Sequence, residues 1–292
     1  ATETVKSVKK LQENENKRAK RKGREPKIYR CPKSKQISIR YNDKTFSIWF
    51  NKNKLSLQTI AGRIKLPIDL PKYYKEYVNW KRCSAELIIR DNKVFLNIVF
   101  SKSTADPISN GKSIGIDRGV KRIAVASNKH FYGGGKVKQV SNRYQRLRSV
   151  LQSKRHSGKR HLAKIKSKEN RFRRDVNHCI SKQIVSTLEP GTTIVFEDLT
   201  NINKNTVKRF KKIDTVNRQK QRDRMSWSFY LLEQFITYKS FDKGCLVSFV
   251  SPVNTSRKCS KCGHISEDNR SCQSVFKCVE CGYQCNADLN AS

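Results

Sequence analysis

Acidic residues are scarce in this chain of 292 residues, since Asp and Glu together number 24 against 63 Lys and Arg. The formal net charge at pH 7 is therefore +39. Such an excess argues against an ordinary enzyme of small metabolites and favours a polyanionic partner, of which nucleic acid is the commonest. An anionic membrane surface is the competing partner, and basic proteins of the ribosomal type share this charge without being enzymes.

Long hydrophobic runs are also missing. No apolar stretch approaches the roughly 18–20 residues of a membrane-spanning helix, and no hydrophobic signal-peptide core lies near the start. We therefore expect an intracellular protein without a membrane partner. Methionine occurs once and position 1 is Ala, which suggests a fragment or a processed chain.

The first third of the chain combines a basic segment with strand signals. Residues 1–28 predict the end of a basic helix, in which nucleic-acid contact and a solvated terminus remain equal alternatives. Residues 29–108 predict short strands that form a small barrel or sandwich. Within them, ISIRYNDKTFSIWF (37–50) and SAELIIRDNKVFLNIVF (84–100) each alternate apolar and polar residues around a turn, which predicts two β-hairpins.

The remainder of the chain alternates strands with helices. Strands are expected within 113–140, a long basic helical region over about 141–188, and a buried strand at TTIVFEDL (192–199). One helix and a helical hairpin broken at Ser157-Gly158 are equally compatible with the basic region. A helix over about 222–242 and a strand near 246–252 follow, and this alternation indicates an α/β layer.

Four of the ten cysteines stand in two C-x-x-C pairs. Fifteen residues separate Cys259-x2-Cys262 from Cys278-x2-Cys281, and a glycine follows each pair. Two such knuckles present four thiolates to one ion, which predicts a closed structural Zn²⁺ site. The neighbouring Cys272, Cys285 and His264 form no second knuckle and rank far below these four as ligands.

Three acids stand at or just beyond the ends of predicted elements. Asp117 ends one apolar strand, Glu197 ends another, and Asp288 follows the cysteine cluster. Each has a structural alternative as a turn or cap residue. Together they match the carboxylate cluster with which phosphodiester hydrolysis holds two Mg²⁺ ions about 3.5–4 Å apart. Asp198 remains a possible substitute for Glu197.

Six motifs make the sequence closely resemble the TnpB (OrfB) family encoded by bacterial and archaeal insertion sequences. They are GIDRGV at 115–120, RFRRDVNHCISKQIV at 171–185, IVFEDLTNI at 194–202, SWSFYLLEQFITYKSFDKG at 226–244, VSPVNTSRKCSKCG at 250–263 and FKCVECGYQCNADLNAS at 276–292. The match is specific over about 111–292 and covers the β-rich part only in outline.

The resemblance implies an RNA-guided DNA endonuclease related to the compact type V CRISPR effectors, with guide RNA and a DNA target as partners. It implies an α/β RNase H-like (RuvC) nuclease domain with an inserted zinc ribbon, preceded by a β-rich barrel-like domain and a basic helical segment. By the same resemblance Asp117, Glu197 and Asp288 are the catalytic acids that bind Mg²⁺. Cys259, Cys262, Cys278 and Cys281 are the zinc ligands. A cytoplasmic prokaryotic protein associated with the nucleoid is expected.

The implied domain boundaries follow the motifs. They are 1–28 for the end of a recognition-lobe-like helical segment, 29–108 for the wedge- or barrel-like domain, 109–251 for the first part of the RuvC-like domain, 252–284 for the zinc ribbon, and 285–292 for the truncated start of the last RuvC segment.

Departures from the family pattern keep two alternatives open. The family's amino-terminal barrel strands and most of its recognition helices have no counterpart, and Arg257 stands where the family usually has Gln. Only four residues follow Asp288, so the helix that carries this acid is expected barely to form. These features suggest a fragment or a decayed copy. Transposase-type DNA strand transfer and an inactive, truncated nucleic-acid-binding fragment are therefore the alternatives to an active nuclease.

Overall fold

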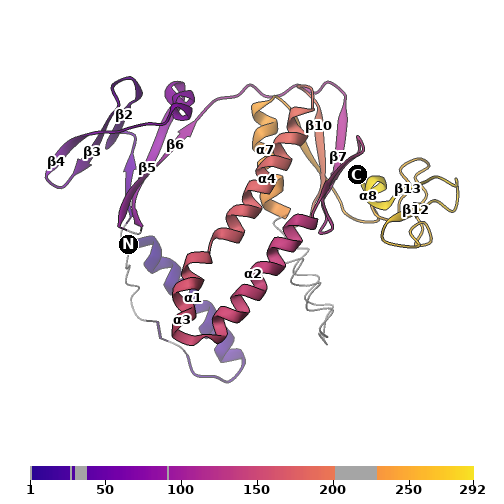
Figure 1. Ribbon diagram of the computed structural model, residues 1–292, viewed down its shortest axis with the longest axis horizontal. Helices are drawn as coiled ribbons and strands as arrows, with labels where there is room; N and C mark the ends of the chain where they lie inside the picture. Colours follow the sequence, from indigo (N-terminus) through magenta and orange to yellow (C-terminus); the bar gives the residue numbers. More distant parts are fainter. Residues whose placement is uncertain (1, 27, 30–37, 91, 201–228) are drawn as a thin grey trace. The chain divides into compact units, whose positions relative to one another are not determined.

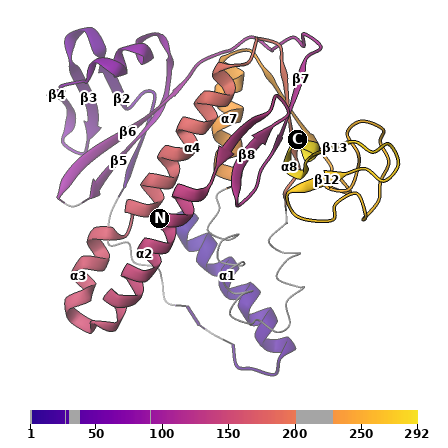
Figure 2. The same ribbon diagram turned by 45° about the vertical axis from the view of Figure 1, so that its right-hand side comes forward.

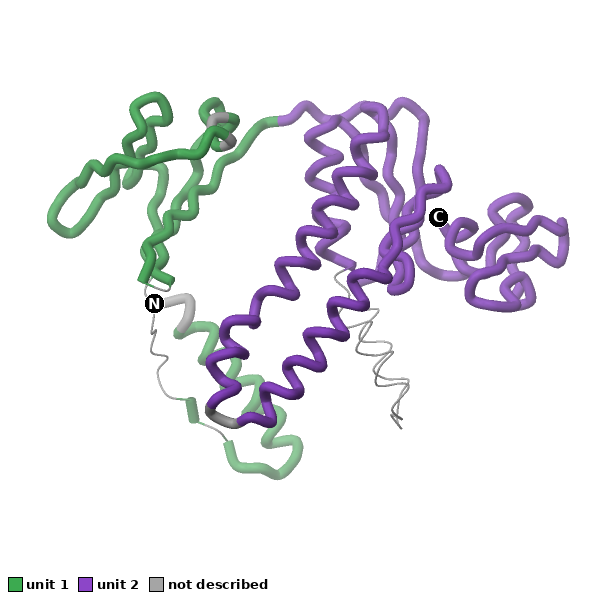
Figure 3. The backbone as a smooth tube through the Cα atoms, viewed as in Figure 1, with its two compact units in different colours: residues 1–103 green, residues 104–292 purple. Residues whose placement is uncertain are grey.

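A computed structural model describes residues 2–26, 28–29, 38–90, 92–200 and 229–292 of the chain. The chain divides into two compact units, residues 1–103 and residues 104–292 (Figure 3). Each unit is built around its own buried apolar cluster.

The described residues of unit 1 form one basic helix, two 3-10 helices and two antiparallel three-stranded sheets, with strand orders β1-β5-β6 and β2-β3-β4. The elements are α1 (Thr2–Arg21), β1 (Ile39–Asn42), β2 (Phe46–Trp49), η1 (Phe50–Lys52), β3 (Lys54–Thr59), β4 (Gly62–Pro67), η2 (Lys72–Asn79), β5 (Lys81–Arg90) and β6 (Lys93–Ser101).

One of the two predicted hairpins is confirmed and the other is wrong. β5 and β6 pair antiparallel from Lys81↔Ser101 to Arg90↔Lys93, as the alternation predicted. β1 and β2 lie in different sheets, because β1 pairs with β5 and β2 pairs with β3. The turn between them does form, since the Asn42 side chain accepts hydrogen bonds from the Thr45 and Lys44 N–H groups. It acts as a corner that brings Tyr41 and Phe46 into one core from two sheets.

Unit 2 is organised around a mixed five-stranded sheet of order β11-β10-β7-β8-β9 (Figure 1). β10 runs parallel to both β7 and β11, whereas β7, β8 and β9 are antiparallel. The strands are β7 (Ser113–Asp117), β8 (Arg122–Ala126), β9 (His130–Gly133), β10 (Thr193–Glu197) and β11 (Leu246–Val250).

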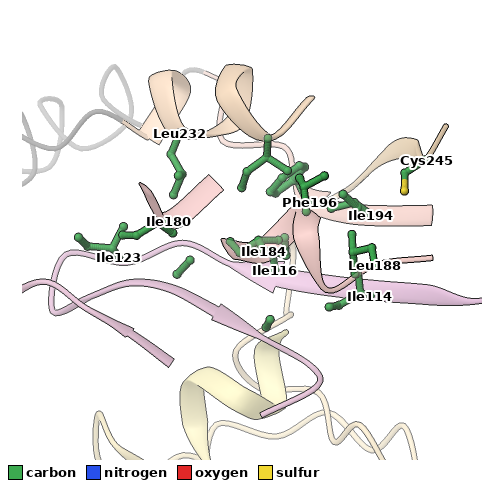
Figure 4. Packing of buried hydrophobic residues seen from close by; sticks show 14 residues of the cluster. Ile114, Ile116, Ile123, Ile180, Ile184, Leu188, Ile194, Phe196, Leu232 and Cys245 are labelled. Atoms are coloured by element: carbon green, nitrogen blue, oxygen red, sulfur yellow. The ribbon is translucent and has the colours of Figure 1, made fainter. Parts of the chain in front are cut away.

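Helices α4 and α7 pack together over one face of this sheet. Their apolar residues meet those of β7, β8 and β10 in a continuous core, including Ile184, Leu232, Ile116 and Phe196 (Figure 4). The helices described in unit 2 are α2 (Gly135–Ser153), α3 (Arg155–Ile165), α4 (Lys168–Ser186), α7 (Phe229–Asp242) and α8 (Ala287–Ala291) (Figure 2). The first part of the helix expected over 222–242, residues 222–228, lies outside the described residues.

The long basic region forms three helices rather than one or two. The first break falls at Lys154 and the second around Lys166–Ser167, so the expected break at Ser157-Gly158 is wrong. Gly158 lies inside α3, where an added Cβ would stand 1.8 Å from the Leu151 carbonyl oxygen. This glycine therefore serves the close approach of α2 and α3 rather than a turn.

The cysteine-rich segment carries a small hairpin of β12 (Val275–Lys277) and β13 (Gln284–Asn286), which leads directly into α8. Phe276, Cys259, Cys278 and Ala287 form its buried cluster. None of the helices in the described part of the chain is long and apolar enough to cross a membrane.

Candidate carboxylate site and metal centre

Asp117 and Glu197 end two neighbouring parallel strands. The register between β10 and β7 runs from Thr193↔Ser113 to Phe196↔Ile116, and the two acids are the next residues on each strand. The carboxyl ends of parallel strands meet at one edge of a sheet, which brings these side chains together.

Strand alternation sets the face on which the two acids lie. Successive side chains of a strand point to opposite faces. Ile114 and Ile116 pack in the core beneath α4 and α7, so Gly115 and Asp117 face the other side. The same reasoning places Glu197 opposite the buried Phe196. Both acids therefore occupy the face of the sheet away from the large helices.

α8 brings the third acid to this same face. A Cβ added to Gly115 would stand 1.5 Å from the backbone oxygen of Ser292, so the end of α8 rests on the bare backbone of β7. Although α8 has only five residues, it has an N-cap: the Asn286 side chain accepts a hydrogen bond from the Asp288 N–H at 3.1 Å. The helix that was expected barely to form thus has five residues, and its cap is Asn286 rather than Asp288, which had been the structural alternative for this acid.

The pKa of Asp117 reflects both the burial of its carboxylate and the charges near it. Burial first, and then the charges of Glu197 and Asp288, raise the pKa of Asp117 from 3.8 to about 6. The N–H of Arg118 and the Arg270 charge lower it by less. The structure thus places the three predicted acids on one face, near enough for the charges of Glu197 and Asp288 to act on Asp117 and to disfavour its ionised form. Their ligand atoms do not lie as close to one another as the sulfurs of the cysteine cluster described below.

Arginines around the acids were not identified from the sequence. Arg122 Nη1 lies 3.4 Å from one Asp288 carboxylate oxygen, and Arg270 Nη2 lies 3.7 Å from the other. Arg118 is buried beside Asp117, donates to the Glu197 carbonyl oxygen at 2.6 Å and pairs with Glu233 of α7. Arginine is so frequent in this chain that no local pattern distinguishes these three.

Asp198 has a different environment from Glu197. Its carboxylate is exposed and accepts hydrogen bonds from the Thr200 hydroxyl at 2.6 Å and the Thr200 N–H at 2.9 Å. These hydrogen bonds lower its pKa. The Asp198 carboxylate is thus bound to the loop that follows β10.

The four predicted cysteines form one compact cluster. The sulfur atoms of Cys259, Cys262, Cys278 and Cys281 all lie within 4.8 Å of one another. Each knuckle closes the same way: Gly263 N–H donates to the Cys259 carbonyl and Gly282 N–H to the Cys278 carbonyl, with positive φ at both glycines. Among the described residues this is the one group of three or more metal-ligand side chains so close together.

The donor set of this cluster fits Zn²⁺. Two Cys-x-x-Cys knuckles supplying four sulfurs match a closed tetrahedral structural site, which leaves no open position for a substrate. The sulfurs hold their protons unevenly in the absence of a cation. Burial alone would raise the pKa of Cys259, but hydrogen bonds from backbone N–H groups and from Cys262 and Cys281 lower it to about 7. The His264 N–H lowers the pKa of Cys262, but loss of solvation and the three other cysteines raise it more, to about 12.

Two buried asparagines hold the ribbon around this cluster. Asn269 donates to the carbonyls of Arg257 and His264 in the first knuckle and accepts from the N–H of Val279 in the second. Asn290 of α8 donates to the Lys258 carbonyl at 2.8 Å and accepts from the Ser260 N–H at 3.1 Å. The helix that carries Asp288 is thus bonded to the backbone on both sides of Cys259.

Two family models match the chain. The model described as "Cas12f1-like, TNB domain" matches residues 229–292, and the OrfB_IS605 model, described as "Probable transposase", matches residues 98–206. The sequence is 33% identical over 234 residues to the CRISPR-associated endodeoxyribonuclease Cas12f1 of Sulfoacidibacillus thermotolerans, covering 72% of this chain and 52% of that protein. It is 31% identical over 162 residues to the TnpB-like protein MJ0751 of Methanocaldococcus jannaschii, covering 54% of this chain and 55% of that protein.

A solved structure shares the fold. The cryo-EM structure of the Cas12f1-sgRNA-target DNA complex matches with a TM-score of 0.59 at 18% identity, covering 88% of this chain and 58% of the Cas12f1 chain. The chain therefore has a mixed α/β fold that resembles Cas12f1. It spans about half the length of the curated relatives it matches.

Proposed function

We infer the function of this chain from its family: it belongs to the TnpB (OrfB) family, carries a Cas12f-like TNB domain and is related to the Cas12f type V CRISPR effectors. We propose that it is an RNA-guided DNA endonuclease that hydrolyses phosphodiester bonds at Asp117, Glu197 and Asp288. The convergence of these three acids on one face of the sheet carries the proposal.

The sheet of unit 2 supports an RNase H-like (RuvC) nuclease domain. Counted along the chain, its strands lie in the order 3-2-1-4-5, with the first three antiparallel and the last two parallel to the first. We assign residues 109–251 and 285–292 to this domain and 252–284 to the zinc ribbon. We assign residues 29–108 to the barrel-like domain and 1–28 to a recognition-lobe-like segment.

The three acids fit Mg²⁺ by their chemistry. Carboxylate oxygens are the ligands that Mg²⁺ prefers, and the repulsion that raises the pKa of Asp117 is relieved by a cation. When bound, Mg²⁺ would activate a water molecule and stabilise the leaving oxygen. Asp117, Glu197 and Asp288 are the residues that would hold it.

The protein's other contributions are positional and electrostatic. Arg118 fixes the end of β10 through the Glu197 carbonyl, which sets the distance between two of the acids. Arg122 and Arg270 balance the charge of Asp288, and both are partly exposed, so they can also attract a substrate phosphate. The cysteine cluster, with Zn²⁺ bound, shapes the ribbon from which Arg270 and α8 project.

Guide RNA and target DNA are the proposed partners, in line with the RNA and DNA held by the Cas12f1 complex of similar fold. The formal charge of +39 suits backbone contacts with both strands. Sequence selection would then rest on base pairing with the RNA rather than on side chains that read bases.

The test is cleavage of a guide-matched DNA by the 292-residue chain, with Mg²⁺ and RNA transcribed from its own locus. We expect cutting that requires RNA and Mg²⁺ and is lost in Asp117→Ala, Glu197→Ala and Asp288→Ala, while Asp198→Ala still cuts. Loss of activity in Asp198→Ala but not in Glu197→Ala would overturn the assignment. Strand joining without RNA would indicate a transposase, and binding without cleavage an inactive fragment.

A further inference from the structure

Phe131 is an aromatic side chain on the same face of the sheet as the three acids. Its strand, β9, is the edge strand next to β8. In the strand register Asp117 of β7 lies opposite Val125 of β8, and Val125 lies opposite Phe131. Residues directly opposite one another in neighbouring strands share a face, so these three side chains form one row across the sheet. Tyr132, the next residue on β9, packs against the core on the other face, which agrees with this placement.

The row is buried in its middle and open at its outer end. Val125 is 1% exposed, and α8 packs against both β7 and β8. Phe131 is 45% exposed, although it is one strand further out on the same face. Two strand spacings, about 10 Å in all, separate β9 from β7. The ring is therefore close enough to Asp117 for one nucleotide strand to reach both of them.

Arg122 couples this ring to the third acid. Its guanidinium carbon lies 4.6 Å from the centre of the Phe131 ring. Its Nη1 donates to the Asn286 side-chain oxygen at 2.5 Å and lies 3.4 Å from a carboxylate oxygen of Asp288. One guanidinium thus contacts the ring, the cap of α8 and an acid. It covers one face of the ring, so a second planar group would stack on the opposite face.

An exposed aromatic ring beside acids suited to phosphodiester hydrolysis fits a nucleobase. Every base has a flat π-face, and stacking on an aromatic side chain tolerates any base. Bases in a duplex already stack on one another, so their faces are accessible mainly in unpaired strands. A Phe side chain has no hydrogen-bonding group with which to read the edge of a base. The ring can therefore recognise that a base is unpaired, but not which base it is.

We propose that Phe131, backed by Arg122, stacks on an unpaired base of the DNA strand that lies at the carboxylate site, next to the phosphate that is cut. The inference rests on the proposed function, since it assigns a base-binding residue to the same site. Phe131 takes no part in metal binding or proton transfer. Its contribution is to hold the strand in register, so that the phosphate lies at Asp117 rather than beyond it.

The test locates the base by photochemical crosslinking. The probe is a short single-stranded thymidine oligonucleotide in which one base is 5-iodouracil, which crosslinks to an aromatic ring stacked on it. The full zinc-loaded chain binds this probe with Ca²⁺ in place of Mg²⁺, so that the strand is held without being cut. Raised salt weakens the binding that rests on phosphate contacts alone. Mass spectrometry then identifies the crosslinked residue.

Three variants give the comparison. Phe131→Leu removes the aromatic face and keeps apolar bulk, whereas Phe131→Tyr keeps the face. Phe241→Leu is the matched control, because Phe241 of α7 is also 45% exposed and lies on the helix layer that covers the other face of the sheet. All three chains are first shown by thermal unfolding to keep the stability of the parent.

We expect a crosslink at position 131 in the parent, in Phe131→Tyr and in Phe241→Leu, and none there in Phe131→Leu. Phe131→Leu should also bind the single strand about tenfold more weakly. For an oligonucleotide with an abasic site in place of 5-iodouracil, its affinity should equal that of the parent. A duplex carrying the same base should give no crosslink at this position.

Several results would overturn the proposal. They are a parent chain that gives no crosslink at Phe131, an equal loss of affinity for the intact and abasic strands, and an equal loss in Phe241→Leu. An equal loss for both strands would show that Phe131 acts only by holding Arg122. Since this test needs neither RNA nor cutting, a crosslink at Phe131 in a chain that fails to cleave guided DNA would refute the endonuclease and leave the stacking intact.

Discussion

Arg118 and Glu233 form an ion pair that joins the end of β7 to α7. The Arg118 side chain is 1% exposed and the Glu233 side chain 19%. The same guanidinium donates to the Glu197 carbonyl oxygen at 2.6 Å and lies 4.9 Å from the centre of the Phe196 ring. The ladder register between β7 and β10 stops at Ile116↔Phe196, so this side chain continues the link between the strands where both acids stand.

Removing one member of this pair should be costly. Arg118→Ala leaves Glu233 without its partner, and we expect the free energy of unfolding to fall by about 3 kcal/mol. The double variant Arg118→Met with Glu233→Leu should regain much of that stability in urea unfolding, because no lone charge remains. Both variants lack the hydrogen bond to the Glu197 carbonyl, so we expect both to bind Mn²⁺, used in place of Mg²⁺, more weakly than the parent chain. If the double variant recovers full metal affinity, Arg118 has only a structural role.

The acids themselves could be predicted from sequence because each ends an apolar run or follows a spaced cysteine motif. Asp117 and Glu197 close strands whose burial is evident from Ile114, Ile116, Ile194 and Phe196. The partners of the acids could not be predicted. Glu233 lies 115 positions beyond Arg118, and pairing over such a distance depends on the packed fold rather than on any local pattern.

The two strand-pairing outcomes in unit 1 have a similar explanation. Asp91-Asn92 and Asn42-Asp43 both carry good turn residues, yet only the first joins two paired strands. Local turn chemistry specifies that the chain reverses or bends, whereas the pairing of β1 with β5 depends on which faces share the core around Tyr41 and Ala85. The helix break at Lys154 could not be predicted in the same way. Gly158 looked like a turn residue in the sequence, but in the structure it lies inside α3 and allows the close approach to Leu151 of α2.

Asp117 should make the metal-free chain less stable at neutral pH. Its pKa is about 6 in the folded chain against 3.8 in the absence of burial, so the folded state binds more protons between these values. Stability from this group is therefore present at low pH and is lost as the pH rises toward about 6, by about 3 kcal/mol in all. Asp117→Asn should stabilise the metal-free chain at pH 7 and flatten this pH dependence in urea unfolding. If the substitution leaves the pH dependence of the free energy of unfolding unchanged, Asp117 is not buried near other negative charges as described here.

The same protonation should weaken metal binding. Below pH 6 we expect the affinity for Mn²⁺ to fall by up to about tenfold for each pH unit, since a ligand must lose its proton first. Titration calorimetry from pH 5 to pH 8 measures this slope at the carboxylate site in the zinc-loaded chain. Asp198→Asn is the control and should keep the parent profile, because Asp198 binds Thr200 instead.

Loss of zinc should release α8 as well as the ribbon. Asn290 bonds α8 to Lys258 and Ser260, on both sides of Cys259, and a helix of five residues is not stable by itself. We expect Cys259→Ser, or chelation of the zinc, to increase hydrogen exchange in both the ribbon and α8. Asn290→Ala should increase exchange in α8 with the zinc still bound, as measured by metal content. Unchanged exchange in α8 after zinc removal would contradict this link.

Gly115→Ala should displace α8 from β7. The new Cβ would stand 1.5 Å from the Ser292 backbone oxygen and 2.7 Å from the Ser292 carbonyl carbon, so the end of α8 must shift. We expect a loss of about 1–3 kcal/mol in stability, with metal affinity reduced through the shift of Asp288. Gly133→Ala is the control, since nothing lies within 4 Å of a Cβ added there. Equal effects of the two substitutions would argue against this contact.

The acids are spread from position 117 to position 288, and this order matters while the chain is being translated. Ribosomes add about 5–20 residues per second, so on the order of ten seconds separate the synthesis of Asp117 from that of Asp288. Helices α2, α3 and α4 leave the ribosome during that interval, ahead of the cysteines and α8. The nascent chain therefore carries Asp117 and Glu197 for several seconds before the third acid is made.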